Sequence, residues 1–244
     1  MRKFGLVGKH ISYSFSKNYF KTKFETENIK NASYENFDIQ SVDDFPSILK
    51  KNTEIAGLNV TIPYKETIIP FLDKLDKTAR KIGAVNTIRV MDSGKLKGYN
   101  TDYFGFKKSL KPFLGKQHQK ALILGTGGAS KAIAFALNEL NIDFVYVSSS
   151  GKKTAISYEM LDQDWIQSHL IIINCTPLGT FPEIENCPKI PYQFLTENHI
   201  LYDLIYNPAV TQFLKNGIKK GCTVVNGQRM LELQAEKSWQ IWNK

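Results

Sequence analysis

The segment KALILGTGGASKAIAFALNELNIDFVYV, residues 120–147, constrains the fold of this chain more than any other part. It contains, in order, an apolar run, two glycines, an alanine-rich stretch and a second apolar run: 121–124, Gly125 and Gly127, 128–140, and 144–147. This order predicts a buried strand, a tight turn, a helix and a second strand, which is the opening unit of a Rossmann-like domain. In that unit the backbone N–H groups of the turn and the N-terminus of the helix face a pyrophosphate. We therefore expect a dinucleotide to bind at the turn, against Gly125, Gly127, Gly128 and Ala129.

The rest of the second half continues this pattern. Apolar runs predict three more strands, at 170–174, 200–204 and 223–226. A helix is expected at 209–219, ended by Gly217 or Gly221. A last helix at 228–244 presents one apolar face, made of Leu231, Ala235, Trp239 and Trp242. Residues 102–227 are thus predicted to form a Rossmann-like, dinucleotide-binding domain.

Helices also alternate with strands in the first half, which predicts a mainly parallel sheet. Strands are expected at 4–7, at 57–60 and, more weakly, at 37–39, with helices at 17–26 and after Asp43-Asp44. The second of these helices would bury Phe45, Ile48 and Leu49. The segments 85–91 and 95–99 flank Asp92-Ser93-Gly94, which is a hairpin signal. We expect an α/β protein of two α/β domains, 1–101 and 102–227, with the helix at 228–244 joining the first.

The composition excludes several other classes of protein. A chain of 244 residues with 42% hydrophobic content fits two domains, and no apolar run approaches the ~18 residues of a membrane span. We expect a soluble, cytoplasmic protein without an export signal. Cys175, Cys187 and Cys222 are odd in number and lack metal-ligand spacing, which indicates reduced thiols and no metal site.

The net charge of +9 raises the question of nucleic-acid binding. Of the 32 basic residues all but four are lysine, and no basic stripe is interleaved with aromatic residues. We interpret the charge as a lysine-rich solvated surface and expect no nucleic-acid partner. The same field would attract an anionic cofactor and a carboxylate substrate.

Short polar side chains stand at the ends of the predicted strands of the first half, in the segments GLNVTIPYKE, GAVNT and GYNTD. They are Asn59, Thr61, Lys65, Asn86, Asn100 and Asp102. Taken singly, each is more often a turn residue, a helix cap or a solvated charge. Together they are suited to a polyhydroxylated ligand, and a lysine with an aspartate can share a proton-transfer task.

These segments resemble the shikimate dehydrogenase family, and the resemblance extends over essentially the whole chain. It is carried by SYSFS, NVTIPYKE, GAVNT, YNTD, GTGGAS, NCTPLG, DLIYNP and NGQRMLELQA. It implies that Lys65 and Asp102 are catalytic and that Ser14 and Ser16, with Thr61, bind the substrate carboxylate. It further implies that Asn59, Asn86 and Gln234 read substrate hydroxyls, that Tyr206 lies on the substrate side, and that the last helix returns to the first domain.

The implied activity is the reversible reduction of 3-dehydroshikimate to shikimate by a reduced nicotinamide. The segment VSSSGKK after the second strand of the glycine unit has no carboxylate, so the signature of an NAD enzyme is missing. Ser149 stands about where NADP-type members have an arginine, and Ser148, Ser150, Lys152 and Lys153 offer groups for a phosphate. We favour NADP over NAD, although the segment also reads as an ordinary solvated loop. The resemblance also implies cofactor contacts at Thr176 and Gly227.

Three alternatives stay open at this stage. One is a broader quinate/shikimate dehydrogenase that uses NAD. A non-catalytic dinucleotide or metabolite sensor is the second, for which loss of Lys65 or Asp102 would be the cue, and both residues are present. The third is nucleic-acid binding through lysine charge. The sequence leaves open whether the protein is a monomer or a homodimer.

Overall fold

A computed structural model describes residues 1–12, 14–149 and 154–244. The chain forms two compact units: the first comprises Met1–Thr101 and Gln234–Lys244, the second Asp102–Leu233. The return to the first domain is predicted from the sequence at residue 228, whereas the compact units divide just before Gln234. The physical reason is that Met230, in the first turn of the last helix, packs in the core of the second unit.

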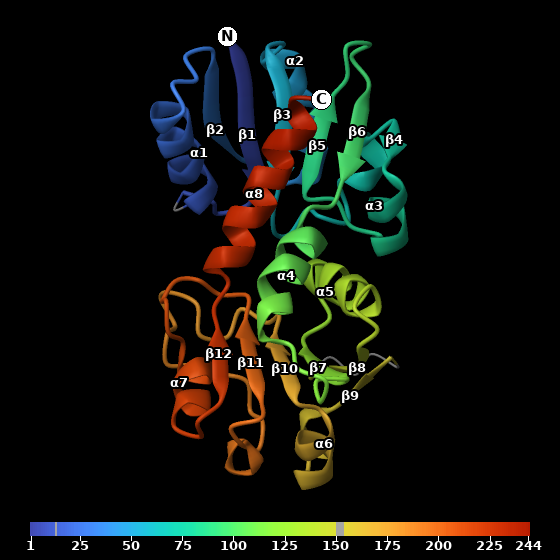
Figure 1. Ribbon diagram of the computed structural model, residues 1–244. Coiled ribbons are helices and arrows are strands. Elements are labelled where there is room, and N and C mark those ends of the chain that lie inside the picture. Colours follow the sequence, from blue (N-terminus) through green and yellow to red (C-terminus); the bar gives the residue numbers. More distant parts are fainter. Residues whose placement is uncertain (13, 150–153) are drawn as a thin grey trace. The chain divides into compact units, whose positions relative to one another are not determined.

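The sheet of the first unit is mixed, and its order is β2-β1-β3-β5-β6-β4 (Figure 1). Its strands are β1 (Arg2–Gly8), β2 (Ala32–Asp38), β3 (Ile55–Val60), β4 (Lys74–Leu75), β5 (Thr87–Val90) and β6 (Leu96–Tyr99). β1 pairs parallel with β2 and β3, and β4 pairs parallel with β6. β5 runs antiparallel to β3 and β6, which confirms the predicted hairpin.

Helices cover both faces of this sheet because its strands alternate between two cores. The helices are α1 (Phe15–Thr26), α2 (Phe45–Lys51), α3 (Lys77–Ile82) and the later turns of α8 (Gln228–Trp242). Phe4 and Leu6 of β1 pack with α1 and α8, while Val7 packs with α2 and α3. Phe45 and Ile48 of α2 are buried as predicted, but Leu49 is only half-buried.

Aromatic side chains hold α8 against this sheet. The Trp242 ring stacks on Phe4 at a centroid distance of 4.9 Å, and its Nε1 donates to the carbonyl oxygen of Ile88 at 2.9 Å. Gly57 lies beneath the same indole, and a Cβ at this position would overlap the ring. The absence of a side chain at Gly57 therefore lets the helix come close to β3.

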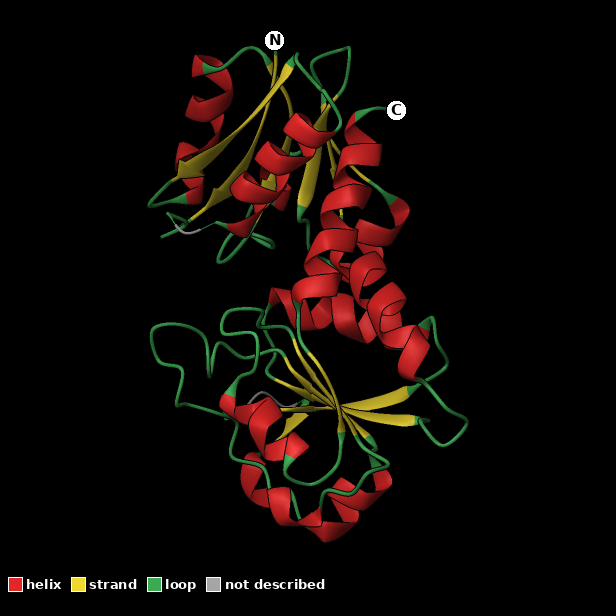
Figure 2. Ribbon diagram, turned by 60° about the vertical axis from the view of Figure 1, so that its left-hand side comes forward, coloured by secondary structure: helices red, strands yellow, loops and turns green. Residues whose placement is uncertain are grey.

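The second unit is built on a wholly parallel sheet of order β12-β11-β10-β7-β8-β9. Its strands are β7 (Lys120–Leu124), β8 (Asp143–Val147), β9 (Ala155–Ile156), β10 (Ile171–Asn174), β11 (Ile200–Asp203) and β12 (Thr223–Val225). Its helices are α4 (Asp102–Leu110), α5 (Gly128–Asn138), α6 (Gln163–Ser168), α7 (Gln212–Ile218) and the first turns of α8. Figure 2 shows this sheet nearly edge-on with helices on both sides. Alternate residues of β7 enter opposite cores, Ile123 with α4 and α5 and Leu122 with α6 and α7, which explains why its strands read as continuous apolar runs.

Some predicted boundaries were wrong. The helix expected at 209–219 begins at Gln212, because the Thr211 hydroxyl caps it by accepting from the backbone N–H of Leu214. Gly217 lies inside α7, where it packs near Leu201, and Gly221, with φ of +75°, follows the helix end. α3 and α6, each of 6 residues, were not predicted because so short a segment shows no clear periodicity.

Within the described part of the chain, none of the helices is long and apolar enough to cross a membrane.

Candidate active site

A buried polar network lies between α8 and the sheet of the first unit. Its members are Asn59 at the end of β3, Asn86 and Thr87 at the start of β5, Thr101 after β6, and Gln234 and Ser238 on α8. Each has at most 6% of its surface exposed. At such burial water cannot replace a missing hydrogen-bond partner, so the side chains hydrogen-bond one another. We call these six residues the amide network.

The Asn86 side chain is held from both sides. Its Oδ1 accepts from the backbone N–H of Thr101 at 2.6 Å and from the Thr87 hydroxyl at 3.1 Å. Its Nδ2 donates to the Thr101 hydroxyl at 3.0 Å and to Oε1 of Gln234 at 3.3 Å. Two of the predicted hydroxyl readers, Asn86 and Gln234, are thereby brought together although 148 residues separate them.

Asn59 connects this network to the predicted carboxylate site. Its Nδ2 donates to the carbonyl oxygen of Asn86 at 3.2 Å and to the Ser238 hydroxyl at 3.0 Å, and its Oδ1 accepts from the Tyr34 hydroxyl at 2.9 Å. Tyr34 is also hydrogen-bonded to Ser16, and burial raises the pKa of its phenol, so the hydroxyl keeps its proton. Most of the hydrogen-bonding capacity of the Asn59 amide is thus taken up by groups of the protein itself.

Ser14 directly precedes α1 in the helix-capping position but makes no capping hydrogen bond. Its Oγ is buried and has no hydrogen-bond partner among the described residues. A buried hydroxyl left in this state requires an explanation, and an oxygen-rich ligand would supply one. The position fits the carboxylate-binding role that the sequence implies for Ser14.

Lys65 lies on the segment that follows β3, and its side chain is half-buried. Its carbonyl oxygen accepts from the backbone N–H of Val85 at 2.7 Å, one residue before Asn86. Thr61 is tied to β1 by a 2.9 Å bond from its N–H to the carbonyl oxygen of Val7. Asp102 directly follows Thr101, begins α4 and is 5% exposed, as the first residue of the second unit.

The predicted dinucleotide turn lies at the carboxyl end of β7. Gly125 has φ of +102°, a conformation that side chains disfavour, and a Cβ there would stand 3.0 Å from the Thr176 methyl. Gly127 has no such strain, with φ of −77°, and a Cβ there would meet no atom within 4 Å. Neither packing nor backbone strain therefore explains a glycine at position 127.

Thr176 belongs to a second buried network that the sequence analysis did not find. Its hydroxyl donates to Oδ1 of Asn174 at 2.6 Å, and Nδ2 of Asn174 donates to Asp203 at 3.0 Å. Asp203 also accepts from the Thr211 hydroxyl at 2.6 Å and from the N–H of Ile205 at 3.0 Å. Burial nevertheless raises the pKa of the Asp203 carboxyl to about 6. The sequence feature that could have revealed this network is the polar residue that ends each of two apolar strands, Asn174 in β10 and Asp203 in β11.

The other predicted contacts are distributed over the second unit. The N–H of Ser148 donates to the carbonyl oxygen of Ile156 at 2.9 Å, and Ser149 is exposed. Ser150, Lys152 and Lys153 lie outside the described residues. Tyr206 is half-buried in the segment after β11. A Cβ at Gly227 would overlap the carbonyl oxygen of Leu204, so packing by itself accounts for this glycine.

The described residues contain no group of three or more His, Cys, Asp or Glu side chains that could hold a metal ion.

A parallel sheet with strand order 3-2-1-4-5-6 and a glycine turn after its first strand defines a dinucleotide-binding Rossmann-like domain. Here that domain is joined to an α/β unit that contains a buried polar site, as in two-domain dehydrogenases. Residues 6–88 match the family model described as "Shikimate dehydrogenase substrate binding domain". The chain belongs to the shikimate dehydrogenase family, which confirms the family and the two-domain α/β fold predicted from the sequence.

The relatives match nearly the whole chain. A protein of Clostridium botulinum named shikimate dehydrogenase (NADP(+)) is 39% identical, covering 98% of this chain and 95% of the relative. The crystal structure of shikimate dehydrogenase from Aquifex aeolicus has a TM-score of 0.89 at 30% identity, covering 100% of this chain and 92% of that one. The enzyme from Thermus thermophilus, solved in complex with NADP(H) and shikimate, has a TM-score of 0.87 at 29% identity, covering 99% and 93%.

Proposed function

We propose that this protein catalyses the reversible, NADPH-dependent reduction of 3-dehydroshikimate to shikimate in the shikimate pathway of aromatic amino acid biosynthesis. The proposal depends above all on the hydrogen bond between Asn86 and Gln234, which joins two predicted hydroxyl readers that are 148 residues apart in the chain. The relatives named as NADP-dependent shikimate dehydrogenases support the same activity. A cytoplasmic location is proposed as well, because all three cysteines are free thiols.

In this proposal the serines and Thr61 hold the substrate acid. The buried Ser14 hydroxyl lacks a partner among the described residues, and a carboxylate oxygen would accept its proton. Ser16 is oriented by its hydrogen bond with Tyr34, and Thr61 directly follows β3. Asn86 and Gln234 then face the ring hydroxyls.

Lys65 and Asp102 divide the proton chemistry. The ammonium of Lys65 donates a proton to the ketone oxygen as negative charge develops on it, which both stabilises that charge and completes the alcohol. Asp102 accepts a hydrogen bond from the hydroxyl next to the reacting carbon. In the reverse direction the neutral lysine amine takes the proton back from the alcohol.

NADPH, when bound, supplies the hydride. Gly125 and Gly127 fit its pyrophosphate, since one permits the tight turn and the other leaves open space at the N-terminus of α5. Thr176, held by Asn174, stands beside this turn. Ser148 and Ser149 are proposed to lie near the 2′-phosphate.

The direct test is to mix the purified protein with shikimate and NADP⁺, then with NAD⁺, and to follow the nicotinamide absorbance. We expect a rapid rise with shikimate and NADP⁺ and a smaller one with NAD⁺. Quinate serves as a second substrate in the same assay. Faster turnover of quinate with NAD⁺ would favour the broader quinate/shikimate alternative, and no turnover of either acid would refute the proposal.

A further inference from the structure

Ser238 is the point at which the amide network converges. It lies on α8 four residues after Gln234, and its side chain is 0% exposed. Its Oγ lies 2.7 Å from the Thr87 hydroxyl, 3.0 Å from Nδ2 of Asn59 and 3.2 Å from the Thr101 hydroxyl. It also donates to the carbonyl oxygen of Gln234 at 2.9 Å.

The hydrogen-bonding capacity of one hydroxyl is fully used by this arrangement. A serine hydroxyl has one proton and two lone pairs. The proton goes to the Gln234 carbonyl, so the lone pairs accept from the Asn59 amide and from one threonine hydroxyl. Polar groups from β3, β5 and the segment after β6 therefore lie within 3.2 Å of a single oxygen atom on α8, and at most one of the two threonine hydroxyls donates to it.

The partners of Ser238 are the groups that orient the proposed hydroxyl readers. Thr87 and Thr101 both bond the Asn86 side chain, and Asn59 bonds the Asn86 carbonyl oxygen. The bond to the Gln234 carbonyl fixes the turn of α8 that carries the other reader. Since Ser238 is wholly buried, it acts on a ligand only through these neighbours.

We propose that Ser238 is a positioning residue for substrate hydroxyl recognition, holding Asn86 and Gln234 in register through Asn59, Thr87 and Thr101. The proposal rests on the function proposed above. It assigns to a residue outside the sequence motifs a role in the affinity for shikimate, separate from its part in anchoring α8.

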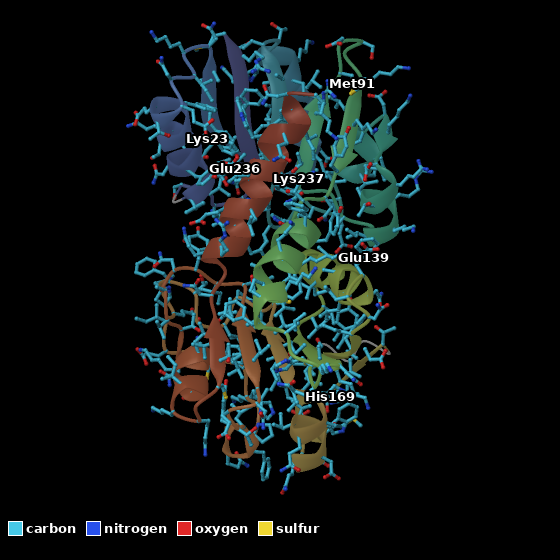
Figure 3. All side chains as sticks on the ribbon, in the orientation of Figure 1. Lys23, Met91, Glu139, His169, Glu236 and Lys237 are labelled. Carbon is cyan, nitrogen blue, oxygen red and sulfur yellow. The ribbon has the colours of Figure 1, made fainter. Side chains whose placement is uncertain are left out.

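The same helix offers a matched control on another side. Glu236 pairs with Nζ of Lys23 on α1 at 2.9 Å and accepts from the Tyr19 hydroxyl, and Figure 3 shows Lys23 and Glu236 on α1 and α8. Lys23 also pairs with Glu27 at 2.6 Å. These partners anchor α8 to α1, and none of them is a member of the amide network. Glu236→Gln therefore weakens the attachment of α8 while leaving Ser238 in place.

The experiment compares Ser238→Ala, Ser238→Thr and Glu236→Gln in the full chain. Each variant is assayed for kcat, for the KM of shikimate and of NADP⁺, and for Tm. We expect S238A to raise the KM of shikimate about fivefold to tenfold, the factor that corresponds to one lost hydrogen bond, with the KM of NADP⁺ unchanged. S238T should restore most of the shikimate affinity, because a threonine hydroxyl also bonds the carbonyl one turn before it. E236Q should lower Tm with both KM values unchanged.

Two results would overturn the inference: a KM of shikimate for S238A no higher than for E236Q, or an equal rise of both KM values. If S238A does not fold, Ser238→Cys makes the same comparison, because it keeps the volume but hydrogen-bonds weakly. Failure of the proposed function is recognised separately, since the unsubstituted protein would then neither bind nor oxidise shikimate, and the inference would fall with it.

Discussion

Buried side-chain amides are held by several hydrogen bonds each in both units. Asn86 is held by Thr87 and Thr101, and Asn174 joins Thr176 to Asp203. Removing one partner from so dry a network leaves another polar atom unpaired, which costs about 1–3 kcal/mol. Substitutions within these networks are therefore expected to alter stability together with function.

At Lys65 an effect on activity can be separated from an effect on stability, because its side chain is only half-buried. Lys65→Ala removes the proposed proton donor, and we expect kcat to fall by about 10²- to 10⁴-fold with little change of Tm. The assay of shikimate oxidation and a thermal melt check this. Lys95→Ala, an exposed lysine in the hairpin turn, is the control and should behave like the unsubstituted protein. Unchanged turnover in K65A would refute the role of Lys65.

Asp203 should make stability depend on pH. Its pKa is about 6 in the folded chain against 3.8 ordinarily, so the folded state binds more protons between these values. The contribution of this carboxyl to the free energy of unfolding therefore decreases as pH rises from about 4 to about 6, by about 3 kcal/mol in all.

The measurement is urea unfolding of the unsubstituted protein and of Asp203→Asn at pH 4.5, 5.5 and 7. Asparagine does not ionise, so D203N should become more stable relative to the unsubstituted protein as pH rises. Groups that titrate alike in both proteins cancel in the difference. A difference that stays constant over this range would show that Asp203 titrates at its ordinary pKa.

Among the elements, α5 and α8 are each preceded by a glycine, and the two glycines have different physical surroundings. Gly127 precedes α5 with ordinary φ and open space around a Cβ, whereas Gly227 precedes α8 against the carbonyl of Leu204. Packing of the chain against itself explains the second position, and we propose that a bound cofactor explains the first.

Gly127→Ala should therefore leave the fold intact and weaken the binding of the cofactor. We expect an unchanged Tm and a KM for NADP⁺ raised about tenfold or more, since the methyl group would occupy the space of the phosphate. Gly227→Ala is the contrasting variant, for which overpacking should lower Tm by roughly 5 °C. Equal loss of Tm in both variants would contradict the assignment of Gly127 to the ligand.

At the scale of the whole molecule, the chain passes from the first unit to the second after Thr101 and returns at Gln234. One face of the first sheet is covered by α1 and α8, where Trp239 and Trp242 pack on Phe4 and Phe20. The first 101 residues therefore lack part of their own core.

A fragment of residues 1–101 should not fold by itself, and a peptide of residues 228–244 should restore its structure. The fragment has no tryptophan, so docking is followed as a blue shift in the emission of Trp239 and Trp242. A peptide with Trp242→Ala, which loses the ring over Gly57, should bind far more weakly. A fragment that shows cooperative unfolding without the peptide would contradict this.

Much of the architecture could be predicted from the sequence. β7, β8, β10, β11 and β12 are continuous apolar runs, and the glycine turn between β7 and α5 is a local signal, so these were predicted close to their observed bounds, whereas the two-residue β9 was not predicted. Short elements and helix ends were harder. α3 and α6 are too short to show a clear periodicity, and the start of α7 is decided by the capping hydroxyl of Thr211.

Some residues of the candidate site could likewise be predicted from the sequence, and others could not. Motif residues such as Asn86 and Gln234 were predicted, while Tyr34, Ser238 and Asp203 were not, since a lone polar residue near an apolar run has many possible roles. The family, the two α/β domains and the motif residues could be inferred from the sequence alone, because these depend on local pattern and motif. Which polar groups share hydrogen bonds follows from the fold, because Asn59 and Ser238 are 179 residues apart and meet only through the return of α8 to the first sheet.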